Sequence, residues 1–337
     1  MMSAVVQAPQ QVRLGYFGKL PARGDFIKAS DNLALVQLLD DWLAQVMNAL
    51  TMAPRWKLNY DALAPLRFAF VGTRSRRAIA GRLEASSDLS QRRFPFMAMS
   101  AFEVADADAF VACSPLALAP LWQRIESLST GLLSQADPAQ ALLALAGSVV
   151  EVEPGGACHA ARFAAFLQDH TLHSLQAMLA SPAFPVTARE LVLGLGMLLL
   201  PVRQSGHGRS VRLEKNLVLP LPIDTRQREL VASFWLHLIL PFLQPLDFEL
   251  ALFFAQLGEA PVLLVGFCGA DPHALRALID PQAACERLIV LDQLDWVDDG
   301  LAQEPALRQL SACLQQEQLS LRSACSMFAD TFTDTFA

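Results

Sequence analysis

The stretch that decides the fold is Gly15–Tyr16–Phe17–Gly18–Lys19–Leu20–Pro21–Ala22–Arg23–Gly24–Asp25–Phe26. Residues 13–18 predict a short strand, and the residues that follow predict a tight loop. Gly18 and Gly24 permit positive φ angles, and Pro21 stiffens the backbone between them. The segment is therefore expected to leave a sheet in a well-defined turn.

Charged and aromatic side chains alternate in this loop, and two interpretations of them stay open. In one, the loop is a structural corner in which Phe17 and Phe26 pack, and Arg23 and Asp25 form ion pairs or cap backbone groups. In the other, the charged tips, Lys19 included, are exposed to bind a partner, since loops on rigid scaffolds often carry function. The candidate partner-binding residues are Lys19, Pro21, Arg23, Gly24, Asp25 and Phe26.

A helix is predicted directly after the loop, from Asn32 to Leu50. Ser30 or Asp31 is expected to cap it, because a short side-chain oxygen accepts a free backbone N–H there. Apolar residues recur every three or four positions and predict one buried face. These residues are Leu35, Leu39, Trp42, Val46 and Leu50.

Two strands are predicted further along, at residues 66–71 and 94–102, with a loop between them. This loop contains several arginines that suit an acidic or phosphorylated partner through bidentate contacts. A solvated hairpin loop is the alternative, and the pattern favours it. The arginines are Arg74, Arg76, Arg77 and Arg82.

Helical patterns dominate residues 118–200, and the best boundary is the Pro–Gly–Gly segment at 153–156. Beyond it, residues 210–220 and 261–267 predict strands, residues 227–240 predict a helix, and residues 248–254 fit a strand or a short helix. Asp271–Pro272 begins another helix, because proline suits the first turn.

The order of these elements predicts an α/β (α+β-like) fold. Strands and helices mix without regular βαβ alternation, so we expect mixed or antiparallel central sheets flanked by helices, in two α/β parts. The expected domains are residues 11–150 and a C-terminal extension of unrecognised type at 151–337.

Residues 13–102 resemble the TagF family, also called ImpM, of bacterial type VI secretion. The string at 15–26 is similar to the family's aromatic–Gly–Lys–Leu–Pro–x–x–Gly–Asp–Phe signature. Asp41–Trp42–Leu43 resembles its tryptophan-bearing first helix, residues 66–70 its first central strand, and Arg93–Phe94–Pro95–Phe96 its Arg–x–Phe–Pro element. Nothing in residues 150–337 is recognised in this way.

The resemblance implies a function in binding rather than catalysis. It implies a cytosolic accessory protein that represses type VI secretion after translation, by engaging the forkhead-associated-domain protein of the apparatus. That action would oppose activation by threonine phosphorylation.

Composition limits the other functional classes. The 337 residues are 53% hydrophobic and 18% charged, which predicts a chain with a substantial core. The formal charge is −7 and no basic run stands out, so a nucleic-acid partner is not expected.

We expect neither membrane insertion nor secretion. The longest apolar runs, residues 191–202 and 230–243, fall short of the roughly 20 residues that span a bilayer. The N-terminal segment MMSAVVQAPQQV has neither a basic start nor a long apolar stretch, so a cytoplasmic location is predicted.

An enzyme is the rival hypothesis, in the form of a cysteine-dependent hydrolase centred on Cys268. This cysteine follows a predicted buried strand and precedes a helix, as in a nucleophile elbow, where the helix N-terminus lowers a thiol pKa. His237 or His273 would be its base. The elbow pattern fails because residue 270 is Ala, so we predict a small buried core residue and no catalytic site.

No metal or cofactor is predicted. His170 and His173 lie three residues apart on a predicted helix, but no third ligand follows from the sequence, and a solvated helix face is the better interpretation. Gly18–Lys19 lacks the spacing of a phosphate-binding loop.

The C-terminal tail repeats phenylalanine every four residues, at Phe328, Phe332 and Phe336. A helix would align them so that they dock on the body of the chain. A second hypothesis makes Thr331, followed by Asp334, a phosphothreonine that a forkhead-associated domain recognises.

Overall fold

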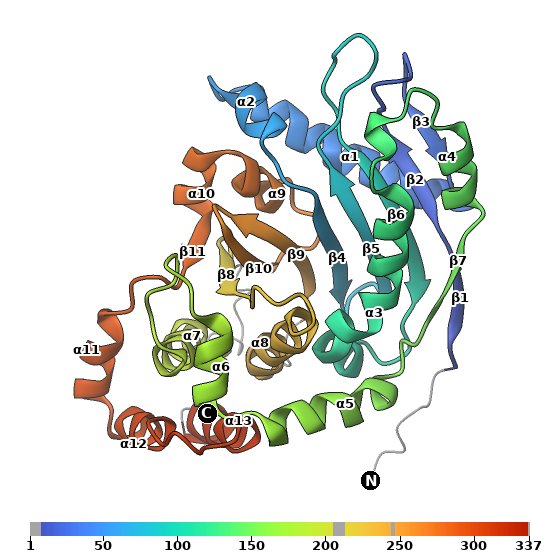
Figure 1. The fold of residues 1–337 in the computed structure, drawn as a ribbon. Helices are drawn as coiled ribbons and strands as arrows, with labels where there is room; N and C mark the ends of the chain where they lie inside the picture. The colour runs from blue at the N-terminus through green and yellow to red at the C-terminus, as the bar shows by residue number, and fades with distance from the viewer. Residues whose placement is uncertain (1–7, 205–212, 244–246, 336–337) are drawn as a thin grey trace.

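The computed structural model describes residues 8–204, 213–243 and 247–335, and within these ranges the centre is one nine-stranded sheet. The strand order is β11-β8-β10-β9-β4-β5-β6-β2-β3 (Figure 1). Adjacent strands pair antiparallel, while β11 is parallel to β8. The strands are β2 (Gly15–Gly18), β3 (Ile27–Ala29), β4 (Leu66–Gly72), β5 (Arg77–Glu84), β6 (Phe96–Glu103), β8 (Asn216–Pro220), β9 (Glu249–Leu257), β10 (Ala260–Gly266) and β11 (Leu288–Val290).

The predicted fold class is confirmed: a mixed sheet is flanked by helices. A small separate ribbon pairs β1 (Gln10–Arg13) with β7 (Val149–Val152). The large sheet crosses the expected boundary at residue 150, because β4 pairs with β9 from Arg67↔Phe254 to Gly72↔Glu249. The division into domains at 11–150 and 151–337 stays a prediction, and the strands on either side of it share one sheet.

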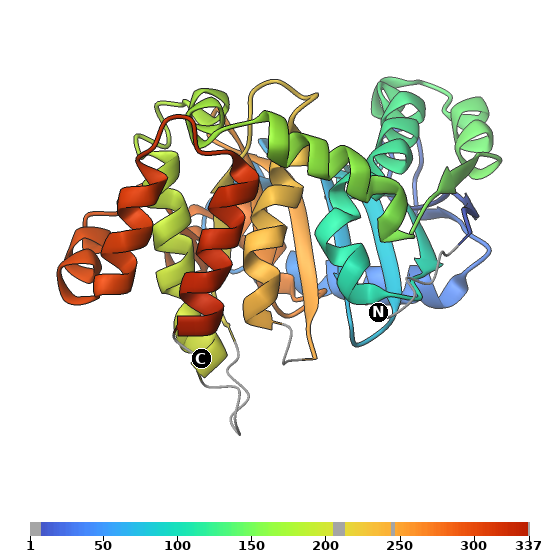
Figure 2. The same cartoon turned by 90° about the horizontal axis from the view of Figure 1, so that it is seen from below.

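Helices cover both faces of the sheet. On one face lie α1 (Leu33–Leu50), α2 (Trp56–Asp61), α9 (Pro272–Ile279) and α10 (Pro281–Arg287). On the other lie α3 (Ala107–Ser129), α4 (Ala139–Ala146), α5 (Gly156–Asp169), α6 (Leu172–Leu179), α7 (Ala188–Gln204), α8 (Arg228–Leu243), α11 (Trp296–Gln303), α12 (Pro305–Leu314) and α13 (Leu321–Ala329). Two short turns complete the chain, the 3₁₀ helix η1 (Leu132–Ser134) and the π-helix η2 (Asp330–Thr335). Figure 2 shows the second layer from below, with α5 in green crossing the ends of the other helices.

The alternation of side chains along the strands builds the two cores. In β4, Phe68 and Phe70 face α1, whereas Ala69 and Val71 face the α3 layer. Successive side chains of a strand point to opposite faces, so a strand buried on both sides is apolar throughout. That accounts for the continuous apolar run at residues 68–71.

The first helix confirms its predicted apolar stripe but not its predicted cap. Asn32, rather than Ser30 or Asp31, is the N-cap, and its side chain accepts the N–H of Leu35 at 2.9 Å. Ser30 Oγ instead accepts the N–H of Asn32 at 3.1 Å, and Asp31 forms an ion pair with Arg13. The cap therefore lies one residue later than Asp31, because these two side chains have other partners.

One further expectation, the arginine-bearing loop, is corrected in detail. Residues 77–84 form β5, so Arg77 and Arg82 lie on a strand and not in a loop, while Arg74 and Arg76 lie in the turn before it. The inward residues Ala78 and Ala80 are small, which leaves the apolar alternation too weak to detect from the sequence.

The second half follows its predictions more closely. The segment at 248–254 corresponds to β9, which begins at Glu249 and resolves the ambiguity in favour of a strand, and the segment at 261–267 corresponds to β10, which ends at Gly266. Asp271 caps α9 through the N–H of His273, with Pro272 in the first turn. The segment at 210–220 contains β8, although residues 210–212 lie outside the described residues.

The tail docks on the body as the apolar stripe predicts. Phe328 and Phe332 are buried, with ring centroids 4.8 Å apart, and both contact Phe242 of α8. Thr331 donates its hydroxyl to the Met327 carbonyl at 2.8 Å. Phe336 lies outside the described residues, and the phosphothreonine hypothesis stays a prediction.

Candidate partner-binding site

The loop between β2 and β3 lies at one end of the large sheet, where β3 is the edge strand (Figure 1). Gly18 begins it with φ +132°, and a Cβ there would lie 2.1 Å from the carbonyl oxygen of Pro95. Only glycine fits such a position. Gly24 does not adopt the positive φ that glycine permits and has open space around it, so its backbone does not require glycine.

Lys19 is not one of the exposed charged tips that the sequence suggested. Its side chain is buried, and its Nζ lies 3.0 Å from Oδ2 of the fully buried Asp88. The same ammonium lies over the ring of Phe26, 4.8 Å from the centroid. The Lys19 ammonium points into the protein because it pairs there with the Asp88 carboxylate.

Asp88 is the centre of this arrangement. Arg92 donates from its backbone N–H at 3.0 Å and from Nε at 2.7 Å, and Ser90 donates its N–H at 2.9 Å. Burial by itself would raise the pKa of Asp88, but hydrogen bonds from Arg92 and Lys19 and the charge of Lys19 hold that pKa well below its ordinary value. The carboxylate is therefore ionised and fixed in place.

The segment from Ser86 to Arg92 supports the loop along its length. Ser86 Oγ donates to the Lys19 carbonyl at 2.7 Å, and the N–H of Leu89 donates to the Arg23 carbonyl at 2.8 Å. Arg92 Nη2 donates to the Gly24 carbonyl at 2.9 Å. Sequence reasoning missed these supporting residues, since an Asp and an Arg in a turn-rich segment carry no sign of contacts with a loop more than 60 residues earlier in the chain.

Three aromatic rings hold the outer part of the loop. Phe26 stacks on Phe17 with centroids 5.6 Å apart and an angle of 4°, and Phe94 meets Phe26 edge-on at 4.8 Å. Such pairs stabilise beyond the area that they bury. Phe17 and Phe94 are buried, yet Phe26 stays 45% exposed. The Phe26 ring is thus held in place by Phe17 and Phe94, while almost half of the residue stays accessible to solvent.

The exposed part of the loop combines this ring with charges, and we call Arg23, Gly24, Asp25, Phe26 and Leu89 the loop surface. Arg23 forms an ion pair with Asp137 at 3.2 Å. Asp25 is exposed, with Oδ1 accepting the N–H of Phe26 at 2.8 Å, and Leu89 is 68% exposed. Pro21, half-buried behind them, completes the set of candidate residues.

The surroundings of Cys268 differ from the nucleophile elbow that a cysteine-dependent hydrolase would need. Cys268 is exposed, not buried as expected, and lies four residues before the start of α9 at Pro272, where Asp271 Oδ1 accepts the free N–H of His273. His237 is exposed on α8, with its ring against that of Phe163, and partial desolvation lowers its pKa.

Several other titratable groups are held by contacts within the chain. His170 ends α5 and packs on Phe166, and its Nδ1 lies 3.3 Å from Ser174 Oγ. Among the described residues no cluster of three His, Cys, Asp or Glu side chains suits a metal ion. Burial raises the pKa of Cys113 and of Cys325 to about 12, which leaves both thiols protonated.

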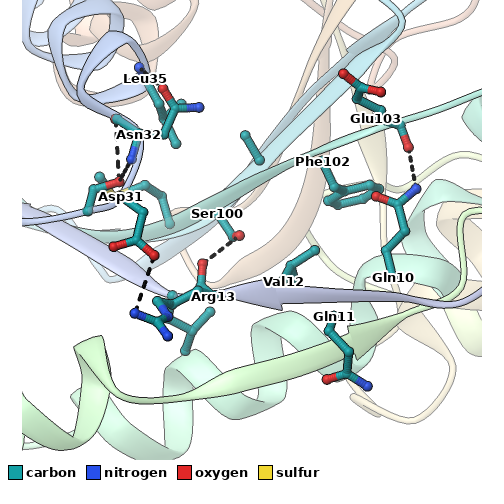
Figure 3. Close-up of a pocket in the computed structure, with 14 residues that line it drawn as sticks. Gln10, Gln11, Val12, Arg13, Asp31, Asn32, Leu35, Ser100, Phe102 and Glu103 are labelled. Carbon is teal, nitrogen blue, oxygen red and sulfur yellow. Dashed lines mark hydrogen bonds and ion pairs between the residues drawn. The ribbon is translucent and has the colours of Figure 1, made fainter.

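A hollow of about 430 Å³ lies where the β1–β7 ribbon leaves the large sheet (Figure 3). Its polar groups are paired with one another: Arg13 with Asp31 at 3.3 Å, and Ser100 Oγ with the Arg13 carbonyl at 2.9 Å. Gln10 Nε2 donates to the Glu103 carbonyl at 2.7 Å. These contacts attach the ribbon to β6 and to the start of α1.

No helix in the described ranges combines the length and apolar character that crossing a membrane requires.

Comparison with known proteins identifies the part of the chain that carries the loop. Residues 15–148 match the model of the TagF N-terminal domain, described as type VI secretion system-associated. A similar solved structure is PA0076 from Pseudomonas aeruginosa PAO1, with 27% identity and a TM-score of 0.34, over 40% of this chain and 61% of that one. This chain thus covers less than two thirds of that protein, and no curated protein matches it. The resemblance expected from the sequence is confirmed: residues 15–148 are a TagF N-terminal domain, a domain described as type VI secretion system-associated.

Proposed function

We propose that this chain is a cytoplasmic accessory protein that represses assembly of the type VI secretion apparatus after translation. It does so by binding a forkhead-associated-domain protein of the apparatus through the loop surface. The TagF N-terminal domain supports the association with the secretion system. The geometry of the loop supports binding rather than chemistry.

The observation that carries the proposal is the state of Phe26. Its ring is 45% exposed, yet Phe17, Phe94 and the Lys19 ammonium fix it from behind. A pre-ordered aromatic loses little conformational freedom on binding, and such residues often dominate the binding free energy of an interface. Leu89 extends the apolar area beside it.

The charges around the ring suit the rim of an interface. Arg23 and Asp137 form an exposed ion pair, and Asp25 lies next to the ring in sequence. Rim charges change association rates and specificity more than affinity. We therefore expect Phe26 to dominate affinity, with Arg23 and Asp25 modulating it.

The test compares F26A with the matched control M52A in calorimetric titrations against the purified forkhead-associated-domain protein of the same bacterium. Met52 is 82% exposed and follows α1, outside the loop surface. We expect F26A to weaken binding by about tenfold or more, a typical effect for an interface aromatic. M52A should bind as the unchanged chain does.

A circular-dichroism melt of both variants accompanies the titration, because Phe26 also packs on Phe17. Weakened binding by a folded F26A supports the proposal. If folded F26A and a folded R23A/D25A variant both keep their affinity for the forkhead-associated-domain protein, the loop is only a structural corner.

A further inference from the structure

A second hollow, of about 740 Å³, lies between the two halves of the sequence. Strands β4, β5 and β9, helices α3 and α5, and the segment leading from β8 into α8 all contribute to its wall. None of the loop-surface residues lines it. The arginines of the wall are Arg67, Arg82, Arg162, Arg226 and Arg228.

Positive charge accumulates here although the chain as a whole carries −7. Glu126 and Glu229 are the carboxylates of the wall, against five guanidinium groups. An excess of cations around a hollow raises the local concentration of anions. The charge balance of the wall therefore differs in sign from that of the chain.

Arg67 is held rigidly on the floor of the hollow. Its guanidinium lies over the rings of Phe254, at 4.8 Å, and Trp122, at 5.2 Å. Its Nη1 donates to Glu229 Oε1 at 2.8 Å. Stacking and a charge-assisted hydrogen bond together fix the orientation of the remaining N–H groups.

Two more arginines are fixed by their neighbours. Arg82 donates to Ser129 Oγ at 2.6 Å and pairs with Glu84. Arg228 donates to the carbonyls of Pro222, at 2.9 Å, and Ile223, at 3.1 Å. Burial and then the nearby charge of Arg67 lower the pKa of Arg228.

Arg162, on α5, and Arg226, before α8, differ from these three. Both are exposed, and no carboxylate in the parts of the chain that the structure describes forms an ion pair with either guanidinium. Their donors remain available to a ligand in the hollow.

We propose that this hollow binds a small organic or inorganic phosphate ligand of about the size of a nucleotide, with Arg162 and Arg226 contacting its phosphate groups. Arginine presents paired donors that match phosphate oxygens, and the wall has several of them. The volume falls within the range of about 300–1,000 Å³ that is usual for small-ligand pockets.

The apolar part of the wall favours a ligand with a non-phosphate portion. Phe254, Leu221, Pro65 and Pro261 lie beside the arginines. Because the wall joins β4 and β5 to α8 and β9, a bound phosphate ligand also links the two halves of the chain. This inference is independent of the proposed function.

The experiment measures binding of three probes to the full chain at low ionic strength: tripolyphosphate, ATP and adenosine. Calorimetry gives the affinity and a thermal melt gives the stabilisation. The variant R162Q/R226Q removes the two available guanidinium groups. The control R308Q/R322Q removes two exposed helical arginines outside the hollow, so the net charge changes equally.

We expect tripolyphosphate and ATP to bind and to raise the melting midpoint, and adenosine to bind far more weakly. R162Q/R226Q should weaken binding about tenfold or more relative to R308Q/R322Q. ATP binding more tightly than tripolyphosphate identifies a nucleotide as the ligand class, and equal affinity identifies the phosphate chain alone; both results support the site.

Two outcomes would overturn the inference. One is that neither phosphate probe binds at concentrations of about 1 mM. The other is that both arginine variants, each folded by circular dichroism, lose affinity equally, since general charge attraction would then account for the binding.

Discussion

At the scale of single residues, the ion pair between Lys19 and Asp88 determines how the partner-binding loop is held. Both groups are buried, and Arg92 and Ser90 donate further hydrogen bonds to the same carboxylate. Removing one partner of a buried pair leaves an uncompensated charge and is strongly destabilising. The pair therefore acts as a support for the loop rather than as a charge offered to a partner.

This pair makes the stability of the fold fall as the pH becomes acidic. The pKa of Asp88 in the folded chain lies below its unfolded value of 3.8. Its contribution to the free energy of unfolding is present above that value and is lost as pH falls through the folded pKa. We expect D88N to be less stable than the unchanged chain at neutral pH, with the difference shrinking below about pH 4.

Urea unfolding at several pH values measures this difference. The matched control is D25N, which removes an exposed carboxylate of the same loop and should follow the unchanged chain at every pH. A stability gap for D88N that stays constant from neutral pH to acid would show that the charge of Asp88 does not stabilise the fold.

At the scale of elements, α1 shows what periodicity predicts well. Trp42 lies on the predicted stripe, is 2% exposed, and contacts Phe68, Phe70 and Phe253. We expect W42A to lower the free energy of unfolding by about 3–5 kcal/mol, as truncation of large buried aromatics does. Denaturant titration checks it, with L38A on the exposed side of α1 as the control.

L38A should change the free energy of unfolding by no more than about 0.5 kcal/mol. If W42A matched L38A, the contacts between α1 and the sheet would contribute little to stability.

Elements with strong apolar patterns could be predicted from the sequence, and those without could not. The helix at 32–50 and the strands near 66–71 and 94–102 follow from their buried side chains. Strand β5 was missed because its inward residues include Ala78 and Ala80. The candidate loop was located from its own residues, but its anchor at Asp88 was not, since the contact joins residues 69 positions apart.

At the scale of the whole molecule, the two halves of the chain share one sheet through β4 and β9. Local patterns carry no information about which distant strands pair, so the sequence predicted the fold class but not the joining of the halves. The arginine-lined hollow arises from this joining, because Arg67 and Arg82 come from one half and Arg162, Arg226 and Arg228 from the other.

Hydrogen–deuterium exchange of the full chain, with and without the forkhead-associated-domain protein, tests the central claim most directly. We expect the partner to slow exchange in residues 19–26 and 86–92, because these segments carry the loop surface and are joined by hydrogen bonds from the Leu89 N–H and the Arg92 side chain. Unchanged exchange in both segments, together with slowed exchange elsewhere in a saturated complex, would contradict binding through this surface.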